Sequence, residues 1–528
     1  MSRLFSLAAV SLGLFLAACG GGGGTFVIPP TPAGPFSVAS LKGQYAFSMS
    51  GVDPRGAYIA RVGSFVADGN GNITGGLEDV LSLGSGLPAS VVSFSSGAYT
   101  VQPNGRAVMT LVSTNGALLL SMTLKSSSAG LMIQTDLNAS SSGSFNLQTP
   151  ADFSTAGING KYVFDFSGIS FSGSLAAPIS IIGQLSANGG GQITGGTLDE
   201  NDGNSATGPS GAMAIAANTY QLDATHGTTF GRASMTVNGR AYALYIVDHT
   251  HFKALEEDGL GGSSGDAVLQ AGTLPAQNSA FTGGFVYLVG GASLQGNRGP
   301  IARVARFTAN GSGGIGAVSY DENNDGQPFH ISQGSNISKA AYAIDTVNAG
   351  SGRGTFTFTD STAGTFSYVF YLSSPTQGVV QDISSGIVAD GTFQAQTGGP
   401  FTTAGSAGNY LFGWSGVQLG SSTATPFEED FVGQYVQASG TTNNIAGSVD
   451  FVELGISSNN NPFINRGISG LLAVNGDGTA NNSYTIVIGG SPSTTIHFQA
   501  YFANPGTVLL VCSDSTRTTA GVATQQTQ

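Results

Sequence analysis

The segment Asp68-Gly-Asn70-Gly-Asn72 places three oxygen-bearing side chains at alternate positions, a spacing found in calcium-binding loops. Three later segments repeat the surrounding sequence, and at the position of Asp68 they carry Asn188, Asn310 and Ser439. A calcium site needs six or more oxygen ligands, several of them carboxylates. Because the repeats lose the carboxylate but keep Gly and other turn formers, we predict a hairpin turn in which Gly and Asn adopt positive φ angles.

A second set of acids recurs at one position of the repeated pattern, namely Asp79, Asp199, Asp321 and, close by, Asp450. The third copy reads Asp321-Glu-Asn323-Asn-Asp325-Gly326, which matches the first half of an EF-hand loop. The twelfth residue of that loop is Ser332 instead of Glu, and no helical pattern flanks it. We interpret these acids as solubilising and turn-capping residues, and calcium binding by Asp79, Asp199 and Asp321 remains an open alternative.

Other motifs lack the context that their chemistry needs. Gly311–Gly316 has the spacing of a dinucleotide-binding loop but no following helix, and Gly261–Gly265 spells a nucleophile elbow within what we expect to be a flexible loop. His249 and His251 lie in an expected turn without a clear third metal ligand. Arginines that follow Gly recur in three copies, and we expect them to fix local turn geometry: Arg106, Arg232 and Arg353.

No catalytic constellation emerges from these residues. An enzyme would require one copy to carry a nucleophile, base or metal set that the others lack, and no copy does. We therefore predict a non-enzymatic protein with no cofactor and no metal ion.

The elements that carry these residues belong to a domain repeated four times. The copies open with alternating large apolar residues in the segments that begin at Gly43, Gly160, Gly284 and Asn409. This alternation is typical of a strand with one buried face. Each copy has about 110 residues, the size of one domain. We expect the domains at 41–148, 158–270, 281–396 and 407–515, with a polar tail at 516–528.

The pattern within each copy predicts an all-β fold. Period-two segments joined by Gly-rich turns give roughly eight strands per copy, and no helical window appears. A meander of eight strands hides its edges by closing into an up-and-down barrel. The alternative is an immunoglobulin-like β-sandwich, although the chain has no Cys…Trp…Cys pattern. Because each copy can bury its own core, we expect four independent domains joined by exposed linkers.

The first residues have the pattern of a secretory signal, with Arg3 followed by an apolar run from Leu4 to Leu16. Leu16-Ala-Ala-Cys19 resembles the lipobox of bacterial lipoproteins. The resemblance covers only residues 1–19 and implies cleavage after residue 18 and acylation of Cys19 by palmitate-type chains. Residues 19–40 would then be a lipidated Gly- and Pro-rich tether. Gly20 stands where an Asp would direct retention in the inner membrane, which favours the outer membrane.

Composition narrows the partners of the chain. The formal net charge of −13 argues against nucleic acid, whose phosphates require basic patches. Cys19 and Cys512 are the only cysteines, so lipidation of Cys19 leaves no intramolecular disulfide. We expect Cys512 to be a buried core residue. We further expect a monomer held to the membrane through Cys19, with a surface protein or polysaccharide as its partner.

Two functions follow from this organisation. The first is a cell-envelope lipoprotein that displays tandem β-domains for adhesion, surface structure or weak multivalent binding. The alternative is a carrier of small apolar ligands inside the barrels, and an envelope hydrolase is a distant third. The residues that would line the carrier's cavities are aromatic: Tyr45, Phe47, Tyr162, Phe164, Phe285, Tyr287, Tyr410 and Phe412.

Overall fold

The computed structural model describes residues 36–83, 86–172, 175–296, 298–332, 337–420, 426–439, 443–455, 461–480, 484–490 and 493–527. Cys19, the signal peptide and most of the expected tether lie outside the described residues. The end of that tether belongs to the fold, because Phe36 is buried in the first core and Val38–Ser40 forms a 3₁₀ turn. Among the described residues, no helix combines the length and the apolar character that a membrane-crossing helix requires.

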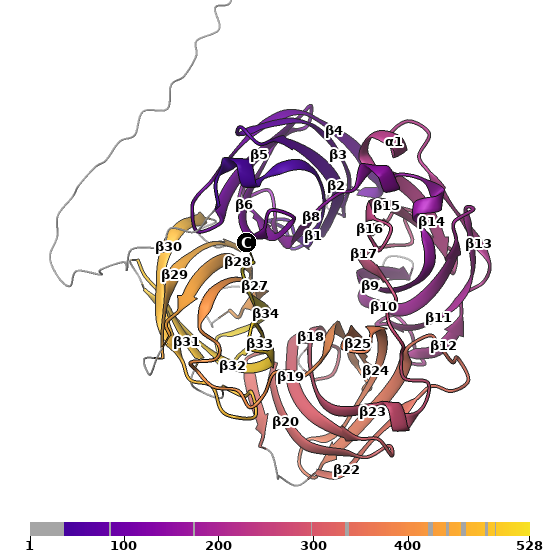
Figure 1. Cartoon of the computed structure of the whole chain (residues 1–528), viewed down its shortest axis with the longest axis vertical. Helices are drawn as coiled ribbons and strands as arrows, with labels where there is room; N and C mark the ends of the chain where they lie inside the picture. Colours follow the sequence, from indigo (N-terminus) through magenta and orange to yellow (C-terminus); the bar gives the residue numbers. More distant parts are fainter. Residues whose placement is uncertain are drawn as a thin grey trace, which may run out of the picture.

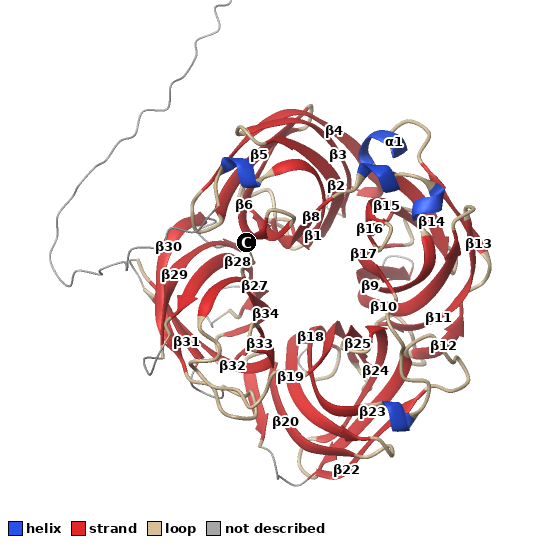
Figure 2. Cartoon of the chain, in the orientation of Figure 1, coloured by secondary structure: helices blue, strands red, loops and turns tan. Residues whose placement is uncertain are grey.

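The chain is all-β and forms four antiparallel β-barrels in tandem (Figure 2). Barrel 1 contains β1 (Lys42–Val52), β2 (Tyr58–Asp68), β3 (Asn72–Ser82), β4 (Gly86–Val101), β5 (Arg106–Ser113), β6 (Gly116–Ser126), β7 (Ala129–Gln134) and β8 (Ser140–Leu147). Barrel 2 contains β9 (Asn159–Ser172), β10 (Leu175–Asn188), β11 (Gln192–Asp202), β12 (Ser210–Ala214), β13 (Asn218–Leu222), β14 (Arg232–Val237), β15 (Arg240–Asp248), β16 (His251–Glu256) and β17 (Gly261–Leu269).

The second half of the chain repeats this order. Barrel 3 contains β18 (Thr282–Ser293), β19 (Gly299–Asn310), β20 (Ile315–Asn324), β21 (Gln327–Ile331), β22 (Ile337–Ile344), β23 (Arg353–Asp360), β24 (Gly364–Ser374), β25 (Gln377–Asp382) and β26 (Ile387–Ala395). Barrel 4 contains β27 (Gly408–Gln418), β28 (Phe427–Gln437), β29 (Asn444–Leu454), β30 (Asn461–Leu472), β31 (Tyr484–Ile488), β32 (Thr494–Asn504), β33 (Thr507–Cys512) and β34 (Arg517–Gln525). The helical pieces are α1 (Gly227–Phe230) and 3₁₀ turns at Pro150–Asp152, Thr155–Gly157 and Asn278–Ala280.

The predicted up-and-down barrel is confirmed. Barrels 1 and 4 close with consecutive strands side by side, and their first strands pair with their last ones. Barrel 2 closes through β10, which pairs with both β9 and β11, while β12 and β13 together take the place of β4. In barrel 3 the short strands β21 and β22 take that place, and only the Gly314–Ala341 bridge joins β22 to the chain before β20. The sandwich alternative is wrong.

The structure contradicts the polar tail expected at 516–528. Residues Arg517–Gln525 form β34, which pairs with β27 along its length and with β33. The polarity of its sequence misled the prediction, because one face of β34 carries small residues that fit against neighbouring strands. Ala523, for example, is fully buried in the fourth core.

The four barrels form a closed ring instead of independent domains (Figure 1). In each barrel the second strand packs against the last three strands of the next barrel along the chain. The same contact joins barrel 4 to barrel 1, where β28 packs against β6, β7 and β8. The expectation of separate domains on exposed linkers is therefore wrong, because the outward faces of these strands also carry apolar residues.

An apolar cluster lies at each junction between barrels. Val62 and Leu77 meet Tyr245 between barrels 1 and 2, whereas Ile133 of barrel 1 meets Val432 of barrel 4. The other two clusters join barrel 2 to barrel 3 through Val163, Ile182, Val369 and Tyr371, and barrel 3 to barrel 4 through Val286, Val304, Tyr501 and Leu509. Burying apolar surface on both faces of a strand stabilises the ring as well as the individual cores.

Candidate functional site

The aromatic residues expected to line ligand cavities lie inside the four barrels. All eight of them, from Tyr45 to Phe412, are at most 3% exposed. Their rings pack on other rings, as Tyr45 does on Phe65 with centroids 5.4 Å apart and Phe412 does on Trp414 at 4.1 Å. The structure therefore places them as core-filling residues.

Three of these tyrosines each make a hydrogen bond of the same kind, which ties the barrel wall to a turn. The hydroxyl of Tyr45 donates to the carbonyl of Ser127 at 2.7 Å. Tyr162 and Tyr410 donate in the same way to the carbonyls of His249 and Pro505, each at 2.7 Å. A phenol whose hydroxyl is bonded to the backbone is a fixed structural element of its barrel.

The loop that opens at Asp68 is a hairpin turn between β2 and β3. Asp68 Oδ1 accepts hydrogen bonds from the backbone amides of Asn70 and Asn72, and Oδ2 accepts one from the Asn72 side chain. These bonds lower the pKa of Asp68 to about 2. Asn188 makes the same two backbone bonds in barrel 2, so an amide oxygen replaces the carboxylate without loss of the turn. The hairpin turn is as predicted, with Gly69 and Gly71 at positive φ, but the expected positive φ at Asn is wrong, because Asn70 and Asn72 do not adopt it.

The recurring acids and the recurring arginines meet across the junctions. Asp79 of barrel 1 accepts two hydrogen bonds from Arg232 of barrel 2, from Nε at 2.9 Å and from Nη2 at 2.8 Å. The hydroxyl of Tyr245 donates to the same carboxylate at 2.8 Å. Asp79 is 1% exposed, so the interpretation of this acid as a solubilising residue is wrong. A carboxylate can be buried here because a two-pronged arginine and a phenol replace its water.

The same arrangement recurs around the ring with informative changes. Asp199 of barrel 2 is held by Arg353 and by the hydroxyl of Tyr371, both from barrel 3. Asp450 of barrel 4 is held by Arg106 of barrel 1, with distances of 2.8 and 3.0 Å. The expected local role of the arginines is therefore incomplete: each binds an acid of the preceding barrel, while Arg232 and Arg353 also bind a nearby acid of their own barrel, Asp223 and Asp345 respectively.

The junction between barrels 3 and 4 uses a different ion pair. Asp321 is held by the hydroxyl of Tyr501 and by His330, and the residue at the arginine position is Asp477. Asp477 pairs instead with Arg306 of barrel 3 at 3.3 Å. At this junction the arginine lies in barrel 3 and the acid in barrel 4, which is the reverse of the other junctions. The junction therefore keeps an ion pair without an arginine at the position where the other copies have one.

The EF-hand-like segment belongs to the same junction. The side-chain amide of Asn323 donates to the carbonyls of Cys512, Asp514 and Arg517 in barrel 4. Asn201 of barrel 2 donates likewise to the carbonyls of Asp382 and Ile387 in barrel 3. Among the described residues no group of three or more His, Cys, Asp and Glu side chains is placed to hold a metal ion.

A glutamine at the end of each barrel completes the junctions. Gln148, the first of them, donates to the carbonyls of Ile246 and Phe230 in barrel 2. Gln270 and Gln396 bind carbonyls of barrels 3 and 4 in the same manner, and Gln526 binds those of Asn104 and Leu124 in barrel 1. Gln148, Gln270 and Gln396 recur visibly in the sequence, whereas their partners can be found only from the structure.

The remaining motifs are structural. Gly311–Gly316 forms the turn before β20 and the start of that strand, and Gly261–Gly265 lies in β17 although a loop was expected. His249 and His251 each contact an acid, Asp152 and Asp266 respectively. The two histidines therefore contact different acids and do not converge on a common site.

The inner wall of the ring carries a cavity of about 340 Å³ lined by barrels 1, 2 and 4. Six serines contribute to its lining, among them Ser48, Ser144 and Ser264. Lys253, whose side chain is fully buried, donates from Nζ to Asp266 at 2.8 Å and to Ser144 at 2.8 Å. The ammonium group of Lys253 is thus paired with the carboxylate of Asp266 and also donates a hydrogen bond to Ser144.

Acidic groups on the inner wall have pKa values that are shifted in opposite directions. Burial opposes ionisation of Asp266, but the charges of Lys253 and His251 hold its pKa below the usual range. Burial raises the pKa of Asp390 to about 6, in spite of hydrogen bonds from Ser180 and Ser167. Burial and the nearby Asp390 raise the pKa of Asp165 well above its ordinary value. The wall between barrels 2 and 3 therefore holds carboxyl groups that ionise reluctantly.

Comparisons with known proteins give no family. No protein-family model and no curated protein matches the sequence. A solved structure of transferrin binding protein B from Haemophilus parasuis Hp5, in mutant form, is 9% identical with a TM-score of 0.19, and the match covers 78% of this chain and 83% of that one. A structure of intact Ap-TbpB with its N and C lobes is 10% identical with a TM-score of 0.14, covering 75% and 83%. At these TM-scores the likeness carries no inference about this chain.

Proposed function

We propose that the chain is a non-enzymatic lipoprotein of the bacterial cell envelope, anchored in the outer membrane through Cys19, whose four barrels form one rigid binding ring. The observation that carries this proposal is the repetition of one junction around the ring. Filled barrels joined by buried ion pairs suit a platform that presents a fixed surface to a protein or polysaccharide.

The ring changes the way in which four copies would bind. Flexible linkers would let weak sites act independently and gain avidity through effective concentration. Barrels that share apolar clusters and buried ion pairs hold their surfaces at fixed mutual positions instead. Binding would then depend on a partner that matches the spacing of the copies, as an ordered surface polymer does.

Anchoring is tested by substitution of the predicted lipidated residue. We expect Cys19→Ser to abolish incorporation of labelled palmitate and to leave the protein held to membranes only by weak binding, so that washing releases it. Cys512→Ser is the matched control, because Cys512 is the only other cysteine and is buried in barrel 4. A Cys19→Ser protein that still takes up palmitate would contradict the lipoprotein proposal.

Binding is tested with the same Cys19→Ser protein after purification. We expect it to co-sediment with isolated outer-membrane polysaccharide or with intact cells, and to leave ester, amide and glycoside model substrates unchanged. Turnover of any of these substrates by the pure protein would contradict the non-enzymatic proposal. If the protein co-sediments with none of the envelope fractions, the proposal that the ring binds an envelope component is contradicted.

A further inference from the structure

Each barrel holds one arginine–glutamate pair inside one of its ends. The pairs lie on the inward faces of the strands, below the aromatic core. Their shortest contacts are Arg61–Glu78 at 2.7 Å, Arg240–Glu256 at 2.8 Å, Arg303–Glu322 at 2.7 Å and Arg517–Glu429 at 3.0 Å. The four barrels thus provide an internal comparison for what such a pair does.

Barrels 2 and 4 use both oxygens of the glutamate within the protein. Glu256 receives Arg240 on Oε1 and Ser263 on Oε2. Glu429 receives Arg517 on both oxygens and Thr519 on Oε1. In barrel 1 the glutamate, Glu78, is only 3% exposed, so its second oxygen is closed off from solvent.

Barrel 3 differs because the unused groups of its pair line an open cavity, whereas the unpaired Oε2 of Glu78 and Nε of Arg61 in barrel 1 are buried. Glu322 accepts hydrogen bonds from Arg303 and Tyr320 on Oε2 alone, and its Oε1 has no partner among the described residues. Arg303 donates from Nε to Glu322 and from Nη1 to Asp382, which leaves Nη2 without a partner in the same part of the chain. One acceptor and one charged donor therefore stand side by side and unused.

A cavity of about 960 Å³ opens over this pair. Arg303 and Glu322 form part of its lining, together with the ring of Phe329 and polar side chains at the rim. The polar lining includes Asn324, Gln327, Thr365 and Ser385. The volume lies within the range of small-molecule sites, and the mostly polar lining suits a polar ligand.

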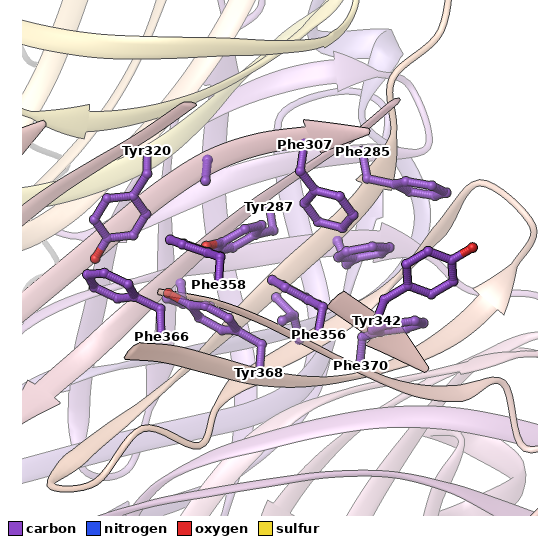
Figure 3. Close-up of a cluster of buried hydrophobic side chains, with 14 of the residues drawn as sticks. Phe285, Tyr287, Phe307, Tyr320, Tyr342, Phe356, Phe358, Phe366, Tyr368 and Phe370 are labelled. Atoms are coloured by element: carbon purple, nitrogen blue, oxygen red, sulfur yellow. The ribbon is translucent and has the colours of Figure 1, made fainter. Parts of the chain in front are cut away.

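The base of the cavity is held rigidly. The guanidinium carbon of Arg303 lies 5.2 Å from the centre of the Phe366 ring, and Asp382 beneath it is fully buried. Figure 3 shows the hydroxyl oxygens of Tyr287, Tyr320 and Tyr368 on the same side of the aromatic cluster. Groups that are fixed before a ligand arrives lose little entropy on binding it.

We propose that this cavity in barrel 3 binds a neutral, hydroxyl-rich small molecule of the size of a mono- or disaccharide. A hydroxyl group both donates and accepts, so neighbouring hydroxyls satisfy Glu322 Oε1 and Arg303 Nη2 together. An anion would be repelled by Glu322, Asp382 and the nearby Asp325, whereas a cation would meet Arg303 at the base. The ring of Phe329 offers an apolar face to the C–H side of a sugar.

The site goes beyond the proposed function and is tested independently of anchoring. Saturation-transfer NMR on the full-length protein would use glucose, galactose, maltose and lactose as probes, with gluconate and glucosamine as charged counterparts. Thr365→Trp fills the cavity from its exposed rim, and Glu322→Gln replaces the charged carboxylate by a neutral amide. Val347→Trp is the matched control, because Val347 is 90% exposed and does not line the cavity.

We expect transfer to at least one neutral sugar with the wild-type protein and with Val347→Trp, and its loss in Thr365→Trp. Glu322→Gln should weaken binding roughly tenfold or more, since a hydrogen bond to a charged group is lost. Transfer to glucosamine or gluconate in preference to every neutral sugar would overturn the proposal. So would transfer that persists unchanged in Thr365→Trp, or the absence of transfer to all neutral probes.

Discussion

The junction between barrels 1 and 2 allows a quantitative test of the ring, through the substitution Arg232→Met. Methionine keeps the apolar stem but leaves Asp79 buried with only the Tyr245 hydroxyl as a partner. Breaking a buried ion pair by removing one partner costs about 3–5 kcal/mol. The remaining phenol bond places the expected cost near the lower end of that range.

The loss is expected to be local, because the substitution weakens one junction and leaves the cores of both barrels intact. The cost of about 3–5 kcal/mol corresponds to amide hydrogen exchange that is roughly 10²- to 10⁴-fold faster, because each tenfold change in the exchange rate takes about 1.4 kcal/mol. The amides to follow are those of β3 and β15, which carry Asp79 and Tyr245. Exchange in barrel 3 should stay unchanged.

Two further variants make the test decisive. Arg55→Met removes an arginine that is 66% exposed from its ion pair with Asp53, whose carboxylate keeps the backbone amides of residue 55 and Ala57 as donors, so the loss should be at most about 1 kcal/mol. The double variant Asp79→Leu with Arg232→Met removes both charges and should recover much of the lost protection. Exchange in Arg232→Met that resembles Arg55→Met would refute the reasoning that buried ion pairs lock the ring.

Three other predictions follow from single residues. The raised pKa of Asp390, about 6 against about 3.9 in an unfolded chain, means that the native state loses stability as the pH rises from roughly 4 to 6. Asp390→Asn should therefore raise the thermal midpoint at pH 8 and leave it nearly unchanged at pH 4; a gain only at pH 4 would contradict this. Burial raises the pKa of the Cys512 thiol, so a thiol reagent such as Ellman's should label it only after denaturation, and rapid labelling of the native protein would disprove its burial. Asp68→Asn should be nearly silent, and millimolar calcium should shift the melting midpoint of neither protein, since the turn satisfies its own carboxylate; a calcium-dependent rise that Asp68→Asn abolishes would restore the metal-site reading.

Much of each barrel is predictable from sequence because its determinants are local. Alternation of residues such as Tyr45, Phe47 and Met49 fixes which face of a strand is buried. The turn at Asp68 follows from its Gly and Asn residues and from the tolerance of other copies for Asn at that position. Such features require no knowledge of what lies outside one copy.

The ring was not predictable in this way, because its contacts join residues that are far apart in the chain. Arg106 and Asp450 pair although they lie in the first and last barrels. One signal was nevertheless present in the sequence. Val286, Tyr287, Leu288 and Val289 are apolar without alternation, which is typical of a strand covered on both faces. Acids and arginines at fixed positions in successive copies were a second signal.

The pairing of Gln526 with barrel 1 has a consequence for the way the protein is made. The residues that complete the circle are synthesised after the rest of the ring, and Thr527 donates to the carbonyl of Lys125 only two residues after β34 ends. Until then the nascent chain is an open arc whose first and last barrels expose Ile133 and Val432 to solvent. Two such arcs carry mutually complementary ends, so a high local concentration of nascent chains favours joined arcs from different molecules. Completion of one chain at a time, or a chaperone that shields these ends, would keep each circle to a single molecule.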